Sequence, residues 1–178
     1  MADRWFISDN HFGHANMLKF KKDNGDLCRP GFVDVDHMDE VMIEKWNSVV
    51  KPEDVVHHLG DICFSQKHLE KILPRLNGKK YLVLGNHDRC GAGFYAKHFK
   101  KVRGWFHYTE KDCAMIFTHC PLHHSSFLGR YDGRCANVHG HTHNRNIPDP
   151  KWINVSVEQI DYTPVHYDAL LQKVRKLG

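Results

Sequence analysis

The chain has 178 residues, of which 41% are hydrophobic and 26% charged, and its formal net charge is +4. These values are ordinary for a globular protein and exclude the disordered and fibrous classes. No apolar run approaches the ~18 residues of a membrane span, and no signal-peptide core follows the first residues. We therefore expect a cytoplasmic protein without a membrane segment, folded as one domain over residues 1–178.

Histidine and cysteine usage narrows the possible chemistry. The chain carries 16 histidines, a proportion high enough to require an explanation. Its six cysteines include no Cys-x-x-Cys pair, so the signature of zinc-ribbon and thioredoxin-type sites is missing. Without a secretion signal, we expect reduced thiols that pack mostly as small hydrophobic side chains. The mild positive charge suits an anionic substrate.

Strand and helix patterns alternate in the first half of the chain. Short β-rich runs predict buried strands at 5–7, 55–59 and 81–84. Apolar residues at helical spacing predict helices at 36–49 and 68–76, and the polar stretch 10–30 is interpreted as a long functional loop. This alternation of strand and helix is typical of a parallel α/β sheet.

The second half is richer in strands. We expect strands at 114–118, 136–138 and 152–157, followed by a basic amphipathic helix at 168–177. The polar segments 120–134 and 144–151 are interpreted as loops between these elements.

Five of the predicted strands end in side chains that can bind a metal. These side chains are Asp9 with His11, Asp61, Asn86 with His87, His119, and His141 with His143. Ligands of open α/β sheets bind at the carboxyl ends of the strands, so residues far apart in sequence are expected to converge there. In Asp-x-His and His-x-His, residues i and i+2 of an extended segment point the same way. Carboxylates, imidazoles and an amide oxygen, without a thiolate, fit a hydrolytic divalent-metal site better than a structural zinc site.

Taken in order, these motifs carry a family resemblance. They are Asp9-Asn10-His11, Gly60-Asp61, Gly85-Asn86-His87-Asp88, His119 and Gly140-His141-Thr142-His143. The set resembles the calcineurin-like metallophosphoesterase superfamily, and the runs 6–9, 12–16 and 46–50 resemble its small bacterial and phage members. The resemblance implies a four-layer α/β/β/α sandwich of two mixed sheets flanked by helices, with a dinuclear metal site at the carboxyl ends of the strands.

The resemblance also implies a role for each motif residue. The implied ligands are Asp9, His11 and His143 for a first metal, Asn86, His119 and His141 for a second, and Asp61 as the bridge between them. Mn²⁺ is the favoured ion, with Fe²⁺, Zn²⁺ and Ni²⁺ as alternatives. In the implied mechanism, hydroxide held between the metals attacks phosphorus, His87 donates a proton to the leaving group, and Asp88 orients the His87 ring.

The implied activity is hydrolysis of phosphodiesters in cyclic or small nucleotide-like substrates. A phosphomonoesterase and a nuclease of the same fold remain as alternatives, with nucleic acid involved only as a substrate. The basic runs are too dispersed and too poor in aromatic residues to indicate a nucleic-acid groove. A non-catalytic binding scaffold is disfavoured, because none of the motif positions is degraded.

Several polar residues outside the ligand set need an assignment. His14 and Arg89 adjoin motif residues and are candidates for substrate binding. Other polar loop residues are expected mostly to face water: Asn16, Arg29, His123, His124 and Arg130. His57 and His58 lie within a strand and are expected to pack or to support ligands. The remaining histidines with no partner pattern are expected at the surface: His37, His68, His98, His107 and His166.

Overall fold

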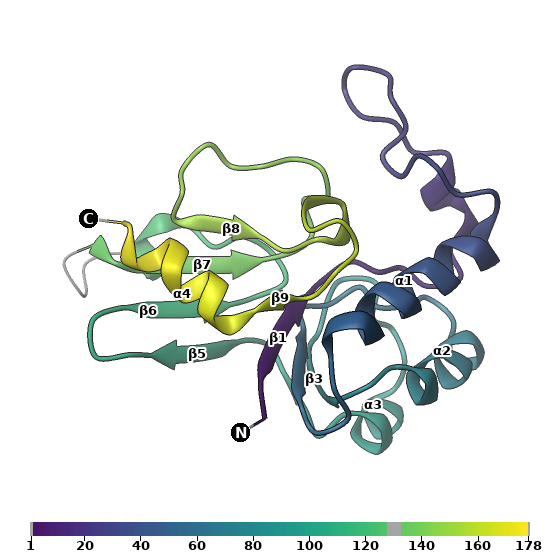
Figure 1. Cartoon of the computed structure of the whole chain (residues 1–178), viewed down its shortest axis with the longest axis horizontal. Helices are drawn as coiled ribbons and strands as arrows, with labels where there is room; N and C mark the ends of the chain where they lie inside the picture. Colours follow the sequence, from purple (N-terminus) through teal and green to yellow (C-terminus); the bar gives the residue numbers. More distant parts are fainter. Residues whose placement is uncertain (1, 128–132, 178) are drawn as a thin grey trace.

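Two mixed β-sheets with flanking helices form the protein in the computed structural model, which describes residues 2–127 and 133–177. The first sheet has the strand order β4-β3-β2-β1-β9, and the second has the order β5-β6-β7-β8. Figure 1 shows the two sheets with helices α1, α2 and α3 gathered beside the first. The predicted α/β class, with two mixed sheets flanked by helices, is confirmed.

The first sheet is built from the strand–helix alternation of the first half. Its strands are β1 (Arg4–Ile7), β2 (Val55–His58), β3 (Lys79–Val83), β4 (Lys101–Arg103) and β9 (Val165–His166). Strands β1 to β4 run parallel, and β9 pairs antiparallel with β1. The helices between them are α1 (Val35–Val49), α2 (Gln66–Ile72) and α3 (Ala92–His98).

The second sheet follows from the strand-rich second half. Its strands are β5 (Phe106–Thr109), β6 (Ala114–Phe117), β7 (Cys135–His139) and β8 (Trp152–Asn154). Strands β6, β7 and β8 are parallel, and β5 is antiparallel to β6. Helix α4 (Tyr167–Arg175) follows β9, and short 3₁₀ turns occupy Ala15–Leu18, Leu73–Arg75, His124–Ser126 and Val157–Gln159.

Two large apolar clusters hold these layers together. The first packs Met38, Met42 and Trp46 of α1 against the outward side chains of the first sheet. The second lies between the sheets, where Phe6 stacks on Phe117 with ring centroids 4.4 Å apart, and α4 contributes to it. Because both faces of β1 and β2 are covered, every side chain of these two strands is buried or half-buried, including His57 and His58.

Three boundaries differ from the sequence-based expectation. Helix α1 begins at Val35, because the side chain of Asp34 accepts the backbone N–H of His37 as its cap. The helix expected to end at Leu76 changes to a 3₁₀ turn after Ile72, where Pro74 lacks an N–H group. The strand expected at 152–157 ends at Asn154, and the chain turns at Val157.

The histidines of β2 face opposite sides of the first sheet. His57 stacks on Phe6 and faces the Tyr108 hydroxyl, whereas the ring of His58 lies against Trp46 and faces Asn10 Oδ1 at 2.9 Å. His68 was expected at the surface, but its Nε2 lies 2.6 Å from Asp39 Oδ2. Within the described residues, no helix is both long and apolar enough to cross a bilayer.

Candidate metal centre

The carboxyl ends of five parallel strands meet at one edge of the two sheets. Strands β1, β2 and β3 of the first sheet lead to Asp9, Asp61 and Asn86, and strands β6 and β7 of the second lead to His119 and His141. Backbone hydrogen bonds connect these ends, including Asp9 N–H to Gly60 O within the first sheet and Gly140 N–H to His119 O within the second. The predicted convergence of these residues is therefore present.

Five of the candidate ligands have a left-handed backbone. The φ angles are 61° for Asp9, 49° for His11, 58° for Asp61, 67° for His141 and 49° for His143. Residues other than glycine rarely adopt this region, and each one in it destabilises the fold by about 1 kcal/mol or more. Such outliers cluster at functional sites, where the surrounding structure holds side chains in required positions.

The first ligand group contains Asp9, His11 and His143, whose ligand atoms lie within 4.8 Å of one another. Asp9 is fully buried, and its Oδ2 accepts hydrogen bonds from the Ser156 hydroxyl and the His141 N–H. Its Oδ1 is buried without a hydrogen-bond partner among the described residues and lies 3.9 Å from His143 Nε2. A buried carboxylate oxygen without a hydrogen-bond partner is suited to bind a cation.

The second ligand group contains Asn86, His119 and His141. His119 Nε2 lies 2.9 Å from Asn86 Oδ1 and 3.3 Å from His141 Nδ1. Asn86 Oδ1 and His141 Nδ1 are 3.0 Å apart. Donor atoms about 2.1 Å from one ion are about 3.0–3.4 Å apart in octahedral or tetrahedral geometry. His119 Nδ1 faces Leu59 O at 2.8 Å, which leaves Nε2 free to bind a metal.

Asp61 lies between the two groups. Its Oδ2 is 3.7 Å from His11 Nε2 and 3.3 Å from His119 Nε2, while its Oδ1 accepts the His87 N–H. Burial opposes ionisation of Asp61, but the hydrogen bond and charge of His119 lower its pKa to about 2. Burial, with a further contribution from His143, lowers the pKa of His11 to about 2. At neutral pH an ionised carboxylate therefore faces a neutral His11 ring.

Glycines permit this close packing at two positions. A Cβ atom at Gly85 would overlap Asp61 Oδ1, and one at Gly140 would overlap Ser8 Oγ and Asp9 Oδ2. The glycines that precede Asn86 and His141 in the motifs therefore make room for carboxylates that follow other strands: Asp61 after β2 of the same sheet, and Asp9 after β1 of the other sheet.

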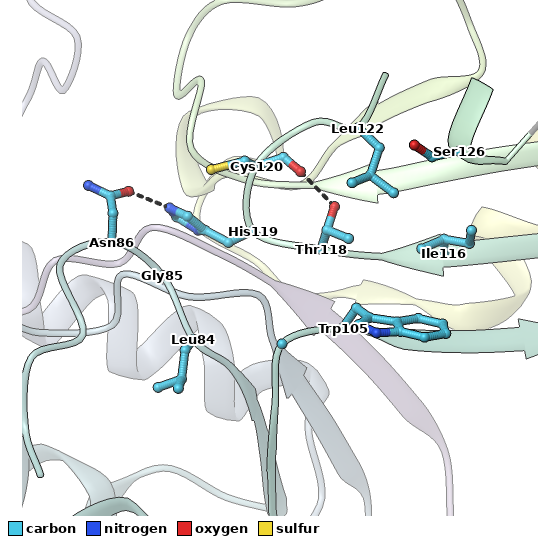
Figure 2. Close-up of a pocket in the computed structure, with 11 residues that line it drawn as sticks. Leu84, Gly85, Asn86, Trp105, Ile116, Thr118, His119, Cys120, Leu122 and Ser126 are labelled. Carbon is cyan, nitrogen blue, oxygen red and sulfur yellow. Dashed lines mark hydrogen bonds between the residues drawn. The ribbon is translucent and has the colours of Figure 1, made fainter. Parts of the chain in front are cut away.

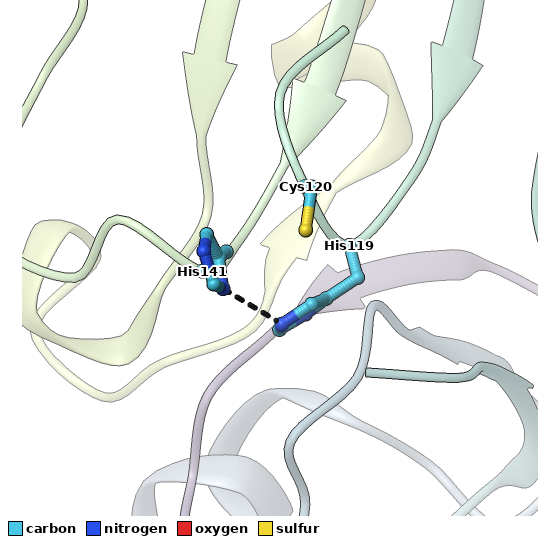
Figure 3. A group of neighbouring side chains, drawn as sticks. All are labelled: His119, Cys120 and His141. Carbon is cyan, nitrogen blue, oxygen red and sulfur yellow. Dashed lines mark hydrogen bonds between the residues drawn. The ribbon is translucent and has the colours of Figure 1, made fainter. Parts of the chain in front are cut away.

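Figure 3 shows Cys120 beside His119 and His141. Its thiol is exposed, and its sulfur lies within 4.8 Å of a ring nitrogen of each of these histidines. The expected donor set contains no sulfur, so this thiol is an addition to the surroundings of the second group. The position of Cys120, directly after His119, was the available signal for this neighbour.

Arg29 and Glu158 form a buried support that sequence reasoning missed. Arg29 Nε donates to Glu158 Oε1 at 2.8 Å, and its terminal nitrogens donate to the carbonyl oxygens of Asp9 and Asn10. The same Glu158 oxygen lies 3.0 Å from His143 Nδ1. The expectation that Arg29 faces water is wrong, because its guanidinium is needed to neutralise Glu158 inside the protein. Burial opposes the ionisation of Glu158, but the charge of Arg29 and then His143 lower its pKa to about 2.

His87 lies beside the first group, with its ring centroid 5.7 Å from that of His11. The resemblance implied that Asp88 orients this ring, but the structure differs. Both oxygens of Asp88 accept backbone N–H groups, from Asp61, Ile62 and Gly85. Nδ1 of His87 has no hydrogen-bond partner within residues 2–127 and 133–177, so the Asp88 carboxylate shapes the loop rather than the ring.

The two candidate substrate-binding residues are placed differently. His14 packs edge to face near His11 and against the half-exposed ring of Phe64, which also contacts His87. Arg89 is exposed and lies 3.5 Å from Asn86 O through its Nε. His123 and His124 are exposed on a 3₁₀ turn, and Arg130 lies outside the described residues.

Comparison with known proteins gives consistent matches over nearly the whole chain. The sequence model of calcineurin-like phosphoesterases matches residues 4–173. An uncharacterized protein of Methanocaldococcus jannaschii is 32% identical over 186 residues, covering 99% of this chain and 93% of that protein. The Gene 66 protein of Mycobacterium phage L5 is 28% identical, covering 83% of this chain and 80% of that protein. A solved protein of unknown function from Aquifex aeolicus is 25% identical with a TM-score of 0.72, covering 97% of this chain and 99% of that one.

Proposed function

Since the chain belongs to the calcineurin-like phosphoesterase family, we propose that it is a phosphodiesterase that requires two divalent metal ions. The observation that carries this proposal is the position of Asp61 Oδ2, 3.7 Å from His11 Nε2 and 3.3 Å from His119 Nε2. A carboxylate placed between two groups of nitrogen and oxygen donors is suited to serve both.

In this proposal Asp9, His11 and His143 hold one ion, and Asn86, His119 and His141 hold the other. The unpartnered Asp9 Oδ1 and the short distances within the second group support the assignment. When bound, the two ions supply Lewis-acid stabilisation of the phosphoryl oxygens and an activated water. We take Mn²⁺ as the ion for reconstitution, because mixed nitrogen and oxygen donors accept it.

The proposed task of His87 is to bind the substrate phosphate and to donate a proton to the leaving oxygen. Its ring is partly exposed beside the first group, where a substrate can reach it, and Phe64 packs against it. Its backbone N–H donates to Asp61 Oδ1 at 2.8 Å, so the backbone of His87 is held beside the proposed bridging residue. A positioned general acid contributes about 10²–10⁴-fold to such a step.

Space on both sides of the centre favours a diester over a monoester. An apolar cavity, lined mainly by Leu84, Trp105, Ile116 and Leu122, adjoins Asn86 and His119. A polar hollow, lined by residues that include Phe20, Lys21 and Arg145, adjoins His141 and His143. A phosphodiester carries an organic group on each side of its phosphate, so both spaces can be filled by one substrate.

The test is metal analysis and ester hydrolysis on the same Mn²⁺-reconstituted sample. We expect close to two metals per chain and turnover of bis(p-nitrophenyl) phosphate that EDTA abolishes, with slower turnover of p-nitrophenyl phosphate. Asp61→Asn should lose both metal binding and turnover. Glu53 is an exposed carboxylate before β2, and Glu53→Gln should lose neither. Turnover of the monoester alone would favour the phosphomonoesterase alternative, and no metal under any reconstitution would refute the proposal.

A further inference from the structure

The apolar cavity beside the second ligand group has the size of a small-molecule pocket. Its volume is about 610 Å³, within the ~300–1,000 Å³ of such pockets. Figure 2 shows Asn86 and His119 at one end, with Trp105 and Ile116 at the other. The cavity is therefore continuous with the proposed metal centre and extends away from it along β6.

Exposed apolar side chains are concentrated around this centre. Among the described residues, six large hydrophobic side chains are exposed: Phe20, Leu27, Val33, Phe64, Leu84 and Trp105. Trp105 and Leu84 line the apolar cavity with 56% and 43% of their surface accessible, and Phe20 and Phe64 lie beside the candidate ligands and His87. Exposed apolar surface gathered in this way is typical of a binding site.

The Thr118 hydroxyl in the cavity is already engaged within the protein. The hydroxyl of Thr118 donates to Cys120 O and accepts from Asn137 Nδ2. The lining includes no lysine, arginine, aspartate or glutamate among the described residues. A second phosphate or another charged group would therefore find no counter-charge there, whereas a planar apolar group would replace water over Trp105, Leu84 and Ile116.

We propose that the apolar cavity binds a ring-bearing ester group of the substrate, which packs against Trp105 while its phosphate lies at Asn86 and His119. This inference rests on the proposed function and specifies its substrate class as phosphodiesters with at least one aromatic or heterocyclic substituent. Trp105 then acts as a specificity-determining residue, because it contacts the organic group and not the phosphate.

The test compares two phosphonates whose C–P bonds are not hydrolysed. Phenylphosphonate and methylphosphonate are titrated calorimetrically into the Mn²⁺-loaded protein, so that binding is measured without turnover. We expect phenylphosphonate to bind about tenfold more tightly to the wild type, as burial and stacking of one ring predict. Trp105→Ala should remove this preference and leave methylphosphonate affinity unchanged, and Trp105→Phe should keep most of it.

Phe20→Ala provides a matched control, because Phe20 is another exposed aromatic residue, 49% accessible, and lies in the polar hollow rather than the apolar cavity. We expect this variant to keep the preference for phenylphosphonate. If the wild type bound phenylphosphonate and methylphosphonate equally well, this inference alone would be overturned. It would also be overturned if Phe20→Ala removed the preference for phenylphosphonate and Trp105→Ala kept it. Failure of both phosphonates to bind the metal-loaded protein would overturn the proposed function together with the inference.

Discussion

Replacing Arg29 with methionine removes a buried cation and keeps an unbranched apolar side chain in its place. The Arg29 side chain is inaccessible to solvent, and its ion-pair partner Glu158 is 2% exposed. Among the described residues, the variant leaves Glu158 with His143 as its remaining side-chain partner, and the carbonyl oxygens of Asp9 and Asn10 lose the Arg29 donors. We therefore expect Arg29→Met to lower the stability of the fold strongly and to weaken binding at the candidate metal centre.

The structure sets the magnitude of this effect. Breaking a buried ion pair by removing one partner costs about 3–5 kcal/mol, because the other charge stays buried. Loss of the residues that orient metal ligands typically weakens metal binding about 10–100-fold. We expect Arg29→Met to lose about 3–5 kcal/mol of unfolding free energy and to bind Mn²⁺ at least tenfold more weakly. The double variant Arg29→Met/Glu158→Gln should recover part of the stability, since no uncompensated charge remains.

Urea unfolding in EDTA measures the stability change, and Mn²⁺ titration measures the affinity change. Arg145→Met is the matched control, because Arg145 pairs with Asp23 on the surface at 2.8 Å, with both side chains more than 70% exposed. Exposed pairs contribute about 1 kcal/mol or less. If Arg29→Met matched Arg145→Met in stability and bound Mn²⁺ like the wild type, the supporting role of Arg29 would be refuted.

Three further predictions test other parts of the structure. Gly85→Ala should abolish Mn²⁺ binding at the second ligand group, because the new Cβ would overlap Asp61 Oδ1. The control Gly91→Ala should bind Mn²⁺ normally, because its new Cβ meets no atom within 4 Å beyond its neighbours in the chain. Equal binding by the two variants would contradict the packing argument. Burial, the largest cause, lowers the folded-state pKa of His57 from 6.5 to about 3, so its contribution to stability is present above pH 6.5 and is lost as pH falls toward 3. Urea unfolding should show about 2 kcal/mol of this loss at pH 5, and an unchanged pH slope in His57→Phe would exclude this residue as the cause. Removing the metals with EDTA should lower the melting temperature, since ions at about 100 times their dissociation constant stabilise the fold by about 2.7 kcal/mol; a melting temperature unaffected by Mn²⁺ or EDTA would argue against binding to the folded state.

Residues at strand ends could be predicted well from the sequence. Asp9, Asp61 and His119 each follow a short β-rich run, and parallel strands bring their carboxyl ends to one edge of a sheet. The family resemblance based on these motifs is confirmed by the match over residues 4–173. The roles of the individual residues, and a single domain over residues 1–178, stay predictions.

Long-range support could not be read in the same way. Arg29 lies in a polar loop, and its burial depends on Glu158, which is 129 residues away. Glu158 itself lies in a 3₁₀ turn, directly after the segment 152–157 that the sequence pattern predicted to be a strand. The apolar cavity is assembled from loops after β3, β4 and β6, and no local periodicity reports how separate loops pack together.

The candidate ligands are divided between the two sheets. Asp9, Asp61 and Asn86 follow strands of the first sheet, whereas His119 and His141 follow strands of the second. Ions held by both sets would act as non-covalent cross-links between the sheets, and their binding energy would be thermodynamically coupled to how the sheets pack. Because such coupling is reciprocal, the packed sheets would bind metal more tightly than loosened sheets by the same factor by which metal binding favours the packed arrangement. A substitution between the sheets that loosens their packing, such as at Phe6 or Phe117, would therefore weaken metal binding. The apolar core between the sheets is thus a remote determinant of affinity at the centre.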